Sequence, residues 1–304
     1  MDVRPLVVDA AAGQQRAWDD LVDRFAPLVW AVARGHGLPP ALAADVAQTV
    51  WLRFAESLSQ AGPDGEPTGG WLAQETRAEA LNALRWADPK RELPAAGADA
   101  LVTALEQLPS RARLALRLAT VPGVSTGELA GGLGLPGTRA VALVDESLQR
   151  LSAVVGGSAT GLRQRLRELD DDLPAAALLT AARAAYSWRT PEGQTTPTSY
   201  DSLFDEGLAT VRSTAGPRLL SFAGGGLELD LEVSVHGSER RLLGQLSPAV
   251  RVRVSIRHGG VREVSVEPDE LGHFAVDGLL PGPLSVRCDE VAGERGIVTG
   301  WVLV

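Results

Sequence analysis

The spacing of apolar residues changes along the 304-residue chain, and this change limits the folds that it can adopt. In the first half they recur every three or four positions, as on one face of a helix, beginning with Trp18, Leu21, Val22 and Phe25. From Arg218 onward they recur every second position, which is typical of strands with one buried face. The sequence therefore predicts a multidomain protein in which helices precede an antiparallel β part.

Three helices are predicted first, over residues 14–34, 41–58 and 71–86. The segment 61–70 is rich in Gly and Pro and is predicted to be a loop. Ser125 then marks the start of a further helix, because Ser125 and Glu128 have the S-x-x-E spacing of a capping box.

The capped helix is predicted to end at Gly134, and another helix is predicted over about 137–151. A capped helix, a glycine turn and a second helix form a helix-turn-helix pattern. Ordinary pairs of packed helices have the same pattern, so the pattern alone leaves both interpretations open.

The last part of the chain is predicted to be a β-sandwich that follows a connecting helix. Asp172 and Pro174 are predicted to begin this alanine-rich helix, which ends at Trp188. Short, evenly spaced strands broken by Gly and Pro are typical of an antiparallel sandwich. The predicted strands are 218–223, 227–235, 240–246, 250–257, 262–267, 271–276, 284–288 and 296–304. The predicted domains are a helical domain (1–90), a linker (91–99), a helix-turn-helix domain (100–156), a linker with a long helix (157–216) and the β-sandwich (217–304).

Composition excludes several classes of function. The net charge of −9 argues against a general polyanion binder, whose domains usually have a basic excess. Cys288 is the single cysteine, so an internal disulfide and a cysteine metal cluster are both excluded. No segment approaches the roughly 18 consecutive apolar residues of a membrane helix, and we expect a cytoplasmic protein. No nucleophile–base grouping or phosphate-binding glycine loop is present, so we expect no enzyme activity, metal or cofactor.

Three segments of the first half carry motifs in a recognisable order. The first is 17–58. The second, 68–85, contains the pair Trp-Leu followed by Arg77, and the third, 104–137, contains the motifs L-P-x-x-x-R and E-L-A. In this order and spacing they resemble a group-4, extracytoplasmic-function type sigma factor of RNA polymerase. Such a factor contains only sigma regions 2 and 4. The resemblance covers about half of the chain and implies two small helical domains, the second of them a helix-turn-helix.

The resemblance implies a polymerase-binding face on the second predicted helix. Asp45 and Gln48 match a D-x-x-Q motif whose helix binds the β′ clamp helices of core RNA polymerase in that family, and Leu52 lies one turn further on. The β flap is the second polymerase element implied. Trp51 and Phe54 on the same helix are predicted to be core residues rather than base-stacking surfaces.

The resemblance also implies DNA contacts. In the family, the loop that matches 61–70 captures a flipped base of the −10 promoter element, and the helix that follows it contacts phosphates. The residues of this chain that would contact DNA are Arg77, Arg85, Lys90 and Arg91 in the first domain, and Arg139 and Arg150 in the helix that would enter the major groove of the −35 element.

The DNA-facing segments are nevertheless poor in basic side chains. The loop contains Asp64 and Glu66, and the middle of the major-groove helix is aliphatic and then acidic at Asp145 and Glu146. Carboxylates repel phosphates, and aliphatic side chains make few hydrogen bonds to base edges. An alternative hypothesis is therefore a sigma-derived protein-interaction adaptor that no longer recognises promoters.

The C-terminal part resembles small proteins that are encoded beside such sigma factors in actinobacteria. Some of those neighbourhoods also encode a CHAT-type protease, which makes such a protease a candidate partner. The run 272–286 also resembles the end of carboxypeptidase-regulatory-like sandwiches, in which Phe274 and Leu279 would fill the core. We expect this part to regulate the helical part, by autoinhibition or by sensing a partner. A ligand-sensing sandwich with the helices as its output is a further alternative.

Some surface features leave alternatives open. The arginines at 251, 253, 257 and 262 would form either a docking patch or cross-strand pairs with the acidic strand 227–235. His236, His258 and His273 are predicted to lie at the surface or in loops. The aromatic residues at 186, 188 and 200 would anchor the long helix to a neighbouring domain or to the sandwich.

Overall fold

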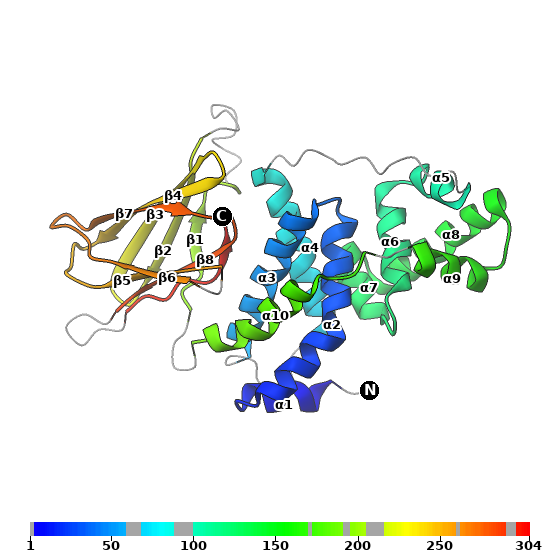
Figure 1. Cartoon of the computed structure of the whole chain (residues 1–304), viewed down its shortest axis with the longest axis horizontal. Coiled ribbons are helices and arrows are strands. Elements are labelled where there is room, and N and C mark those ends of the chain that lie inside the picture. The colour runs from blue at the N-terminus through cyan, green and yellow to red at the C-terminus, as the bar shows by residue number, and fades with distance from the viewer. Residues whose placement is uncertain are drawn as a thin grey trace. The chain divides into compact units, whose positions relative to one another are not determined.

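Helices form the N-terminal part of the chain and antiparallel strands the C-terminal part, as predicted (Figure 1). The structure is a computed structural model and describes residues 3–58, 68–87, 100–169, 172–190, 195–204, 216–259, 262–289 and 296–304. The chain divides into two compact units. The first consists of Met1–Val50 and Ser57–Tyr186, and the second of Trp51–Glu56 and Ser187–Val304.

The helical elements follow each other closely in the sequence. They are α1 (Arg4–Ala11), α2 (Gln15–Gly35), α3 (Pro40–Ser57), α4 (Thr68–Ala87), α5 (Ala100–Glu106), α6 (Ser110–Thr120), α7 (Thr126–Leu133), α8 (Gly137–Val155), α9 (Ala159–Leu169), α10 (Ala176–Ala184) and a short 3-10 helix, η1 (Ala185–Trp188). Within the first unit α4 packs on both α2 and α7, and α6 packs on α2, α7, α8 and α9. The two predicted helical domains, 1–90 and 100–156, thus contribute to one unit.

The periodicity located α2 and α3 to within one residue at each end. The structure differs at α4, which begins at Thr68 and not at Trp71, so Gly69 and Gly70 are helical and not part of a loop. It differs also at α10, which begins at Ala176 with Ala175 as its N-cap, so Asp172 does not begin this helix. The rest of the predicted loop, through Pro67, lies outside the described residues.

The predicted capping box at the start of α7 is confirmed. The Ser125 hydroxyl accepts the backbone N–H of Glu128 at 3.2 Å, and a Glu128 carboxylate oxygen accepts the backbone N–H of Ser125 at 2.6 Å. Gly134 ends the helix with φ +60°, in the left-handed region that favours glycine. α8 begins three residues later, at Gly137, so the turn between the two helices is short.

The segment that follows α10 is anchored on α2 by aromatic side chains. The Trp18 ring stacks on Tyr186 with ring centroids 5.5 Å apart, and Trp18 Nε1 donates to the Ala182 carbonyl at 3.0 Å. The Tyr186 hydroxyl donates to the Ala10 carbonyl of α1 at 2.5 Å. Trp188, which like Trp301 belongs to the second unit, packs edge-on against that tryptophan. Tyr186 therefore contacts the helices of the first unit, whereas Trp188 contacts the sandwich. Each of the two alternatives for these aromatic side chains thus holds for one of them.

Two sheets form the β-sandwich of the second unit. Its strands are β1 (Thr198–Asp201), β2 (Arg218–Gly224), β3 (Leu227–His236), β4 (Glu239–Ser247), β5 (Val254–His258), β6 (Arg262–Val266), β7 (His273–Leu279), β8 (Pro283–Cys288) and β9 (Val302–Leu303). One sheet has the order β1-β2-β3-β4-β7 and the other the order β6-β5-β8-β9, with antiparallel pairing between all these neighbours.

The alternating pattern of 227–235 is reproduced in β3, whose leucines and Val233 are buried while the acidic side chains between them face outward. Phe274 and Leu279 are buried, as predicted. Phe274 occupies the space above Gly244, where a side chain would overlap with its ring. His258 is also buried, because its strand is covered on both faces, so its prediction as a surface residue is wrong.

The arginine-rich segment does not pair with the acidic strand. β3 pairs with β2 and β4, whereas β5 pairs with β6 and β8 in the other sheet, so the predicted cross-strand charge pairs do not form. Arg257 is buried, donates to the Ser285 hydroxyl at 2.7 Å and lies 4.9 Å from the centroid of the Trp301 ring. It therefore does not belong to an exposed patch, whereas Arg251 and Arg253 are exposed.

Candidate nucleic-acid and polymerase interface

The predicted polymerase-binding residues lie on α3. Asp45 and Gln48 are half-buried and share one side of the helix, because three residues span slightly less than one turn. Leu52, one turn further, is buried. Trp51 and Phe54 are buried as well and contact each other edge-on, which confirms their prediction as core residues.

The predicted DNA contacts of the first domain fall in different environments. Arg85 is exposed near the C-terminal end of α4. Arg77, two turns earlier, is half-buried, and its guanidinium fills the space that a side chain at Gly134 would need. Lys90 and Arg91 lie outside the described residues. Arg77 therefore contacts the end of α7 in this structure.

α8 presents a mixed surface. Arg139 and Arg150 are exposed and lie three helical turns apart on the same side. Val141, Asp145 and Glu146 are exposed as well, so basic, apolar and acidic side chains alternate on the surface of the helix. The opposite side, which includes Val144 and Leu148, is buried against the neighbouring helices.

His36 caps the C-terminal end of α2, where α4, α6 and α7 meet. Burial lowers the pKa of His36 below its ordinary value of 6.5, and the nearby charges of Arg77 and Arg111 lower it further, whereas a hydrogen bond with the Gly132 backbone opposes them. Its Nε2 atom is buried and has no hydrogen-bond partner among the described residues. A neutral ring is therefore favoured at this position.

We expect the helical unit to lose stability as the pH falls. The pKa of His36 is lower in the folded chain than in the unfolded one, so below 6.5 the unfolded chain binds more protons. The free energy of unfolding should be constant well above pH 6.5, where the ring is neutral in both states, and decrease as the pH falls through and below 6.5. Urea unfolding followed by the helical circular dichroism signal measures this, with the variant His36→Gln as the control. A variant with the same pH dependence as the wild type would contradict the assignment to His36.

Asp172, which the sequence marked only as a possible helix start, holds three side chains of the first unit. Its carboxylate accepts hydrogen bonds from Arg34 Nε at 2.7 Å and Arg117 Nη2 at 2.8 Å, both at Oδ2, and from Trp30 Nε1 at 3.0 Å, at Oδ1. Burial raises the pKa of Asp172, but the hydrogen bonds from Arg34 and Arg117 outweigh it and leave the pKa below its ordinary value. Asp172 thus joins α2 to α6 through one charged group.

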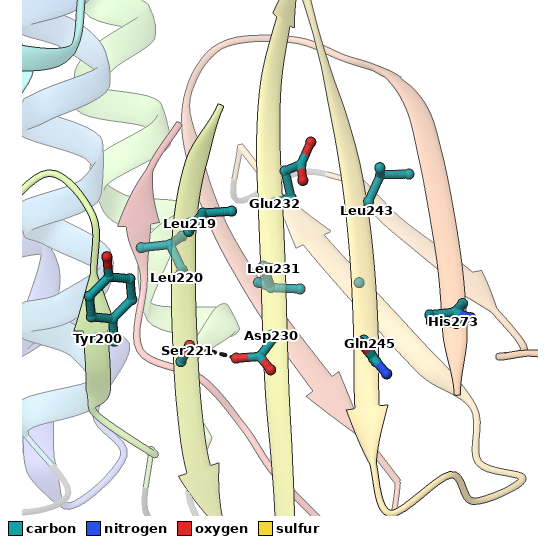
Figure 2. Close-up of a pocket in the computed structure, with 11 residues that line it drawn as sticks. Tyr200, Leu219, Leu220, Ser221, Asp230, Leu231, Glu232, Leu243, Gln245 and His273 are labelled. Atoms are coloured by element: carbon teal, nitrogen blue, oxygen red, sulfur yellow. Dashed lines mark hydrogen bonds between the residues drawn. The ribbon is translucent and has the colours of Figure 1, made fainter. Parts of the chain in front are cut away.

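The five-stranded sheet has a hollow of about 300 Å³ on its outward face. Figure 2 shows the side chains around it, with the Ser221 hydroxyl donating to Asp230 at 2.5 Å. Glu232 and His273 lie on the same face. The hollow lies at the small end of the volume range of ligand pockets and is the place where a ligand-sensing role of the sandwich would be tested.

Among the described residues no group of His, Cys, Asp and Glu side chains is arranged to hold a metal ion. No helix in the described part of the chain is both long enough and apolar enough to cross a bilayer.

Comparisons with known proteins agree with the motifs of the first domain. Residues 21–88, which span most of α2 through α4, match the model of the family described as Sigma-70 region 2. No curated protein matches the sequence significantly. A solved structure titled "Structure of CnrH in complex with the cytosolic domain of CnrY" is 29% identical to this chain, over 51% of this chain and 97% of that one. Its TM-score of 0.36 does not establish a shared arrangement of helices. The chain therefore contains a segment similar to sigma-70 region 2 at α2–α4.

Proposed function

We propose that this protein is a sigma-factor-like transcription initiation protein that binds core RNA polymerase through α3 and brings it to promoter DNA. The observation that carries the proposal is the match of residues 21–88 to sigma-70 region 2. The D-x-x-Q motif at Asp45 and Gln48 lies within that match and on one side of α3. This side would bind the β′ clamp helices, and the helical segment α5–α8 would bind the β flap.

Promoter contacts would come from α4 and α8. Arg85, Arg139 and Arg150 are exposed, which suits contacts to phosphates and bases. Recognition of the −35 element would depend on few groups, because Asp145 and Glu146 share the surface of α8 with the two arginines. The proposed specificity therefore rests more on the −10 element than on the −35 element.

The β-sandwich would act as a regulator of the helical unit. A domain in the same chain has a high effective concentration, so even a weak contact with the helical unit would suppress initiation. A regulator partner, a CHAT-type protease among the candidates, would act by cleaving the connecting segments 156–172 or 189–200 or by binding the sandwich. An enzymatic role for the chain itself is not part of this proposal.

The decisive experiment combines polymerase binding with run-off transcription on fragmented genomic DNA of the source organism. The full chain is compared with Asp45→Arg, which reverses the charge of the proposed polymerase-binding face. We expect Asp45→Arg to weaken polymerase binding by about tenfold or more. The variant places a positive charge where the polymerase surface would be complementary to a negative one, and like charges across an interface repel each other. Asp20→Arg makes the same charge change on an exposed position of α2 and should bind as the wild type does.

Discrete transcription start sites that depend on the protein, and that become more abundant after cleavage in the segment 189–200, would support both parts of the proposal. Polymerase binding without start sites, before and after cleavage, would instead favour the adaptor hypothesis. If Asp45→Arg and Asp20→Arg bound polymerase equally well, the proposed binding face would be wrong.

A further inference from the structure

Helix α9 packs on the helix-turn-helix, although it follows the segment 100–156 that was predicted to form that domain. Its buried residues, Leu162 and Leu166, are four positions apart and share one side, and the helix packs on α6 and α8. Figure 1 shows α9 beside α8. The rest of α9 contains three arginines, at positions 163, 165 and 167. α9 is therefore an amphipathic helix whose apolar side joins it to the helix-turn-helix and whose other sides are rich in positive charge.

The chain is held in place at both ends of α9. Gly156 and Gly157, between α8 and α9, have φ angles of +71° and +97°, in the left-handed region that favours glycine. The Ser152 hydroxyl donates to the Gly157 carbonyl at 2.7 Å, and the Ser158 hydroxyl accepts a backbone N–H of the first turn of α9 at 3.2 Å. Beyond α9, Asp172 binds side chains of α2 and α6. Local contacts before and after α9 thus fix its position on the helix-turn-helix.

One side of α8 has an acidic residue where a DNA-binding helix would need a cation. Arg139 and Arg150 lie on the same side of α8, and Asp145 lies about a third of a turn away around the axis, because one turn contains 3.6 residues. The major groove is about 12 Å wide, so a helix that lies in it has a phosphate backbone on either side. The two arginines suit one backbone, whereas Asp145 would repel the other.

α9 places arginines on the side of α8 that contains Asp145. Arg163 Nη2 lies 3.5 Å from Asp145 Oδ1, and the two side chains are 38% and 57% exposed. A pair this exposed adds little stability, but it brings a positive charge to the carboxylate. Arg167 is exposed and lies four residues after Arg163, so it shares the same side of α9. Arg165 is exposed as well, but it lies about 200° around the helix from both of them.

The helix-turn-helix segment has a basic excess once α9 is included. Residues 100–169 contain eight basic and five acidic side chains, a net charge of +3, although the whole chain has a net charge of −9. α9 contributes +2 of this excess, from its three arginines and Glu168. A basic excess confined to one segment is the electrostatic signature of a nucleic-acid-binding surface. The charge of this segment therefore complements a phosphate backbone, whereas the charge of the rest of the chain does not.

We propose that α9 is a DNA-contacting helix, in which Arg163 neutralises Asp145 and, together with Arg167, binds the phosphate backbone on the side of the major groove where α8 has no arginine. The inference rests on the proposed function, which supplies promoter DNA as the partner. It goes further by assigning contacts to a helix that follows the helix-turn-helix. Such contacts position the duplex and do not read its sequence.

Binding of the full chain to a fluorescent DNA duplex of about 20 base pairs, measured between about 50 and 200 mM salt, tests the proposal. The logarithm of the binding constant falls with the logarithm of the salt concentration, with a slope of about −0.9 for each phosphate contacted. We expect Arg167→Gln to make this slope shallower by about 0.9 and to weaken binding about eightfold at 0.1 M salt. Arg165→Gln is the matched control: it removes the same charge from the other side of the same helix and should leave the slope unchanged.

Asp145→Asn tests the neutralisation by Arg163 with a change of opposite sign. Without the carboxylate, Arg163 is free to bind a phosphate, so we expect tighter binding and a steeper slope. The helical circular dichroism signal checks that these exposed substitutions leave the fold intact. Equal changes of slope in Arg165→Gln and Arg167→Gln would overturn the assignment to one side of α9. An unchanged slope in Arg167→Gln, or no binding of the duplex by the wild type at about 50 mM salt, would overturn the proposal as a whole.

Two further measurements separate this inference from the proposed function. If Arg139→Gln made the slope shallower and Arg167→Gln did not, α9 would not contact DNA, while the proposed contacts of α8 would stand. If Arg167→Gln behaved as expected but run-off transcription gave no start sites, the inference would stand and the proposed function would be wrong. If Arg167→Gln weakened binding to core polymerase and left duplex binding unchanged, α9 would bind an acidic protein surface instead, and the inference would be overturned.

Discussion

Replacing Asp201 with alanine is expected to destabilise the β-sandwich by about 3–5 kcal/mol, because it leaves a buried guanidinium without its carboxylate. Arg218 and Asp201 form a two-point ion pair, Nε to Oδ1 at 3.0 Å and Nη2 to Oδ2 at 2.6 Å, with side chains 7% and 8% exposed. Arg218 Nη1 also donates to the Leu303 carbonyl at 2.6 Å. One side chain thus connects β1, β2 and β9, which come from both sheets.

Urea unfolding combined with amide hydrogen exchange in β1, β2 and β9 measures this effect. Arg251→Ala is the control, because Arg251 and Glu270 are 3.9 Å apart with side chains that are 90% and 91% exposed. Exposed ion pairs of this kind contribute little, so no measurable change is expected. If Asp201→Ala and Arg251→Ala lowered the free energy of unfolding equally, the burial of the Arg218–Asp201 pair would not explain its contribution to stability.

Trp18→Ala is expected to destabilise the helical unit by about 3–5 kcal/mol. Trp18 is completely buried in α2, and its ring, its Nε1 donor and its stacking on Tyr186 all contribute. Removing the indole leaves a cavity and an unpaired carbonyl at Ala182. Because Tyr186 loses its stacking partner, α10 should also become more open to hydrogen exchange.

The graded variant Trp18→Phe separates these contributions. Phenylalanine retains a stacking ring and most of the volume but lacks the Nε1 donor, so a smaller loss, about 1–3 kcal/mol, is expected. Chemical unfolding of both variants, with hydrogen exchange of α10, provides the measurement. If Trp18→Ala had the same midpoint urea concentration of unfolding as the wild type, Trp18 would not anchor α10.

The sequence predicted correctly those helices and strands that are specified by residues close together in the chain. The period of the apolar residues located α2 and α3, and Ser125 with Glu128 gave the first residue of α7, because a capping box involves only four consecutive residues. The strict alternation of β3 was equally visible, since it reflects one buried face of a sheet. Helix α1 was missed: its two valines show no clear apolar stripe, and the Tyr186 hydroxyl that binds its Ala10 carbonyl is 176 residues away.

Elements that depend on distant partners could not be predicted in the same way. Gly69 and Gly70 predicted a loop because glycine disfavours helices, and only the backbone of α7 explains why they are helical. Asp172 looked like a helix start, but its partners Arg34 and Arg117 lie far away in the sequence. Arg257 looked like part of an exposed patch, because no local pattern reports that a strand is covered on both faces.

The candidate site was predicted less completely than the fold. The exposed positions of Arg85, Arg139 and Arg150 agree with a DNA-contacting role, and their role stays a prediction. The position of Arg77 at Gly134 depends on the approach of α7, which no pattern in α4 indicates. His36 carried no signal either, because a lone histidine after a helix has no distinctive spacing.

The position of Asp172 in the chain also has a consequence for synthesis. Asp172 is added 85 residues after Ala87, the last residue of α4 (172 − 87 = 85). Ribosomes add about 5–20 residues per second, and N-terminal segments fold first, so the interval is on the order of ten seconds. During that interval a nascent chain already contains α2–α4 but lacks the carboxylate that joins Arg34 to Arg117. Each molecule therefore passes through a stage of synthesis in which Arg34 and Arg117 are both present but the carboxylate that they share is not.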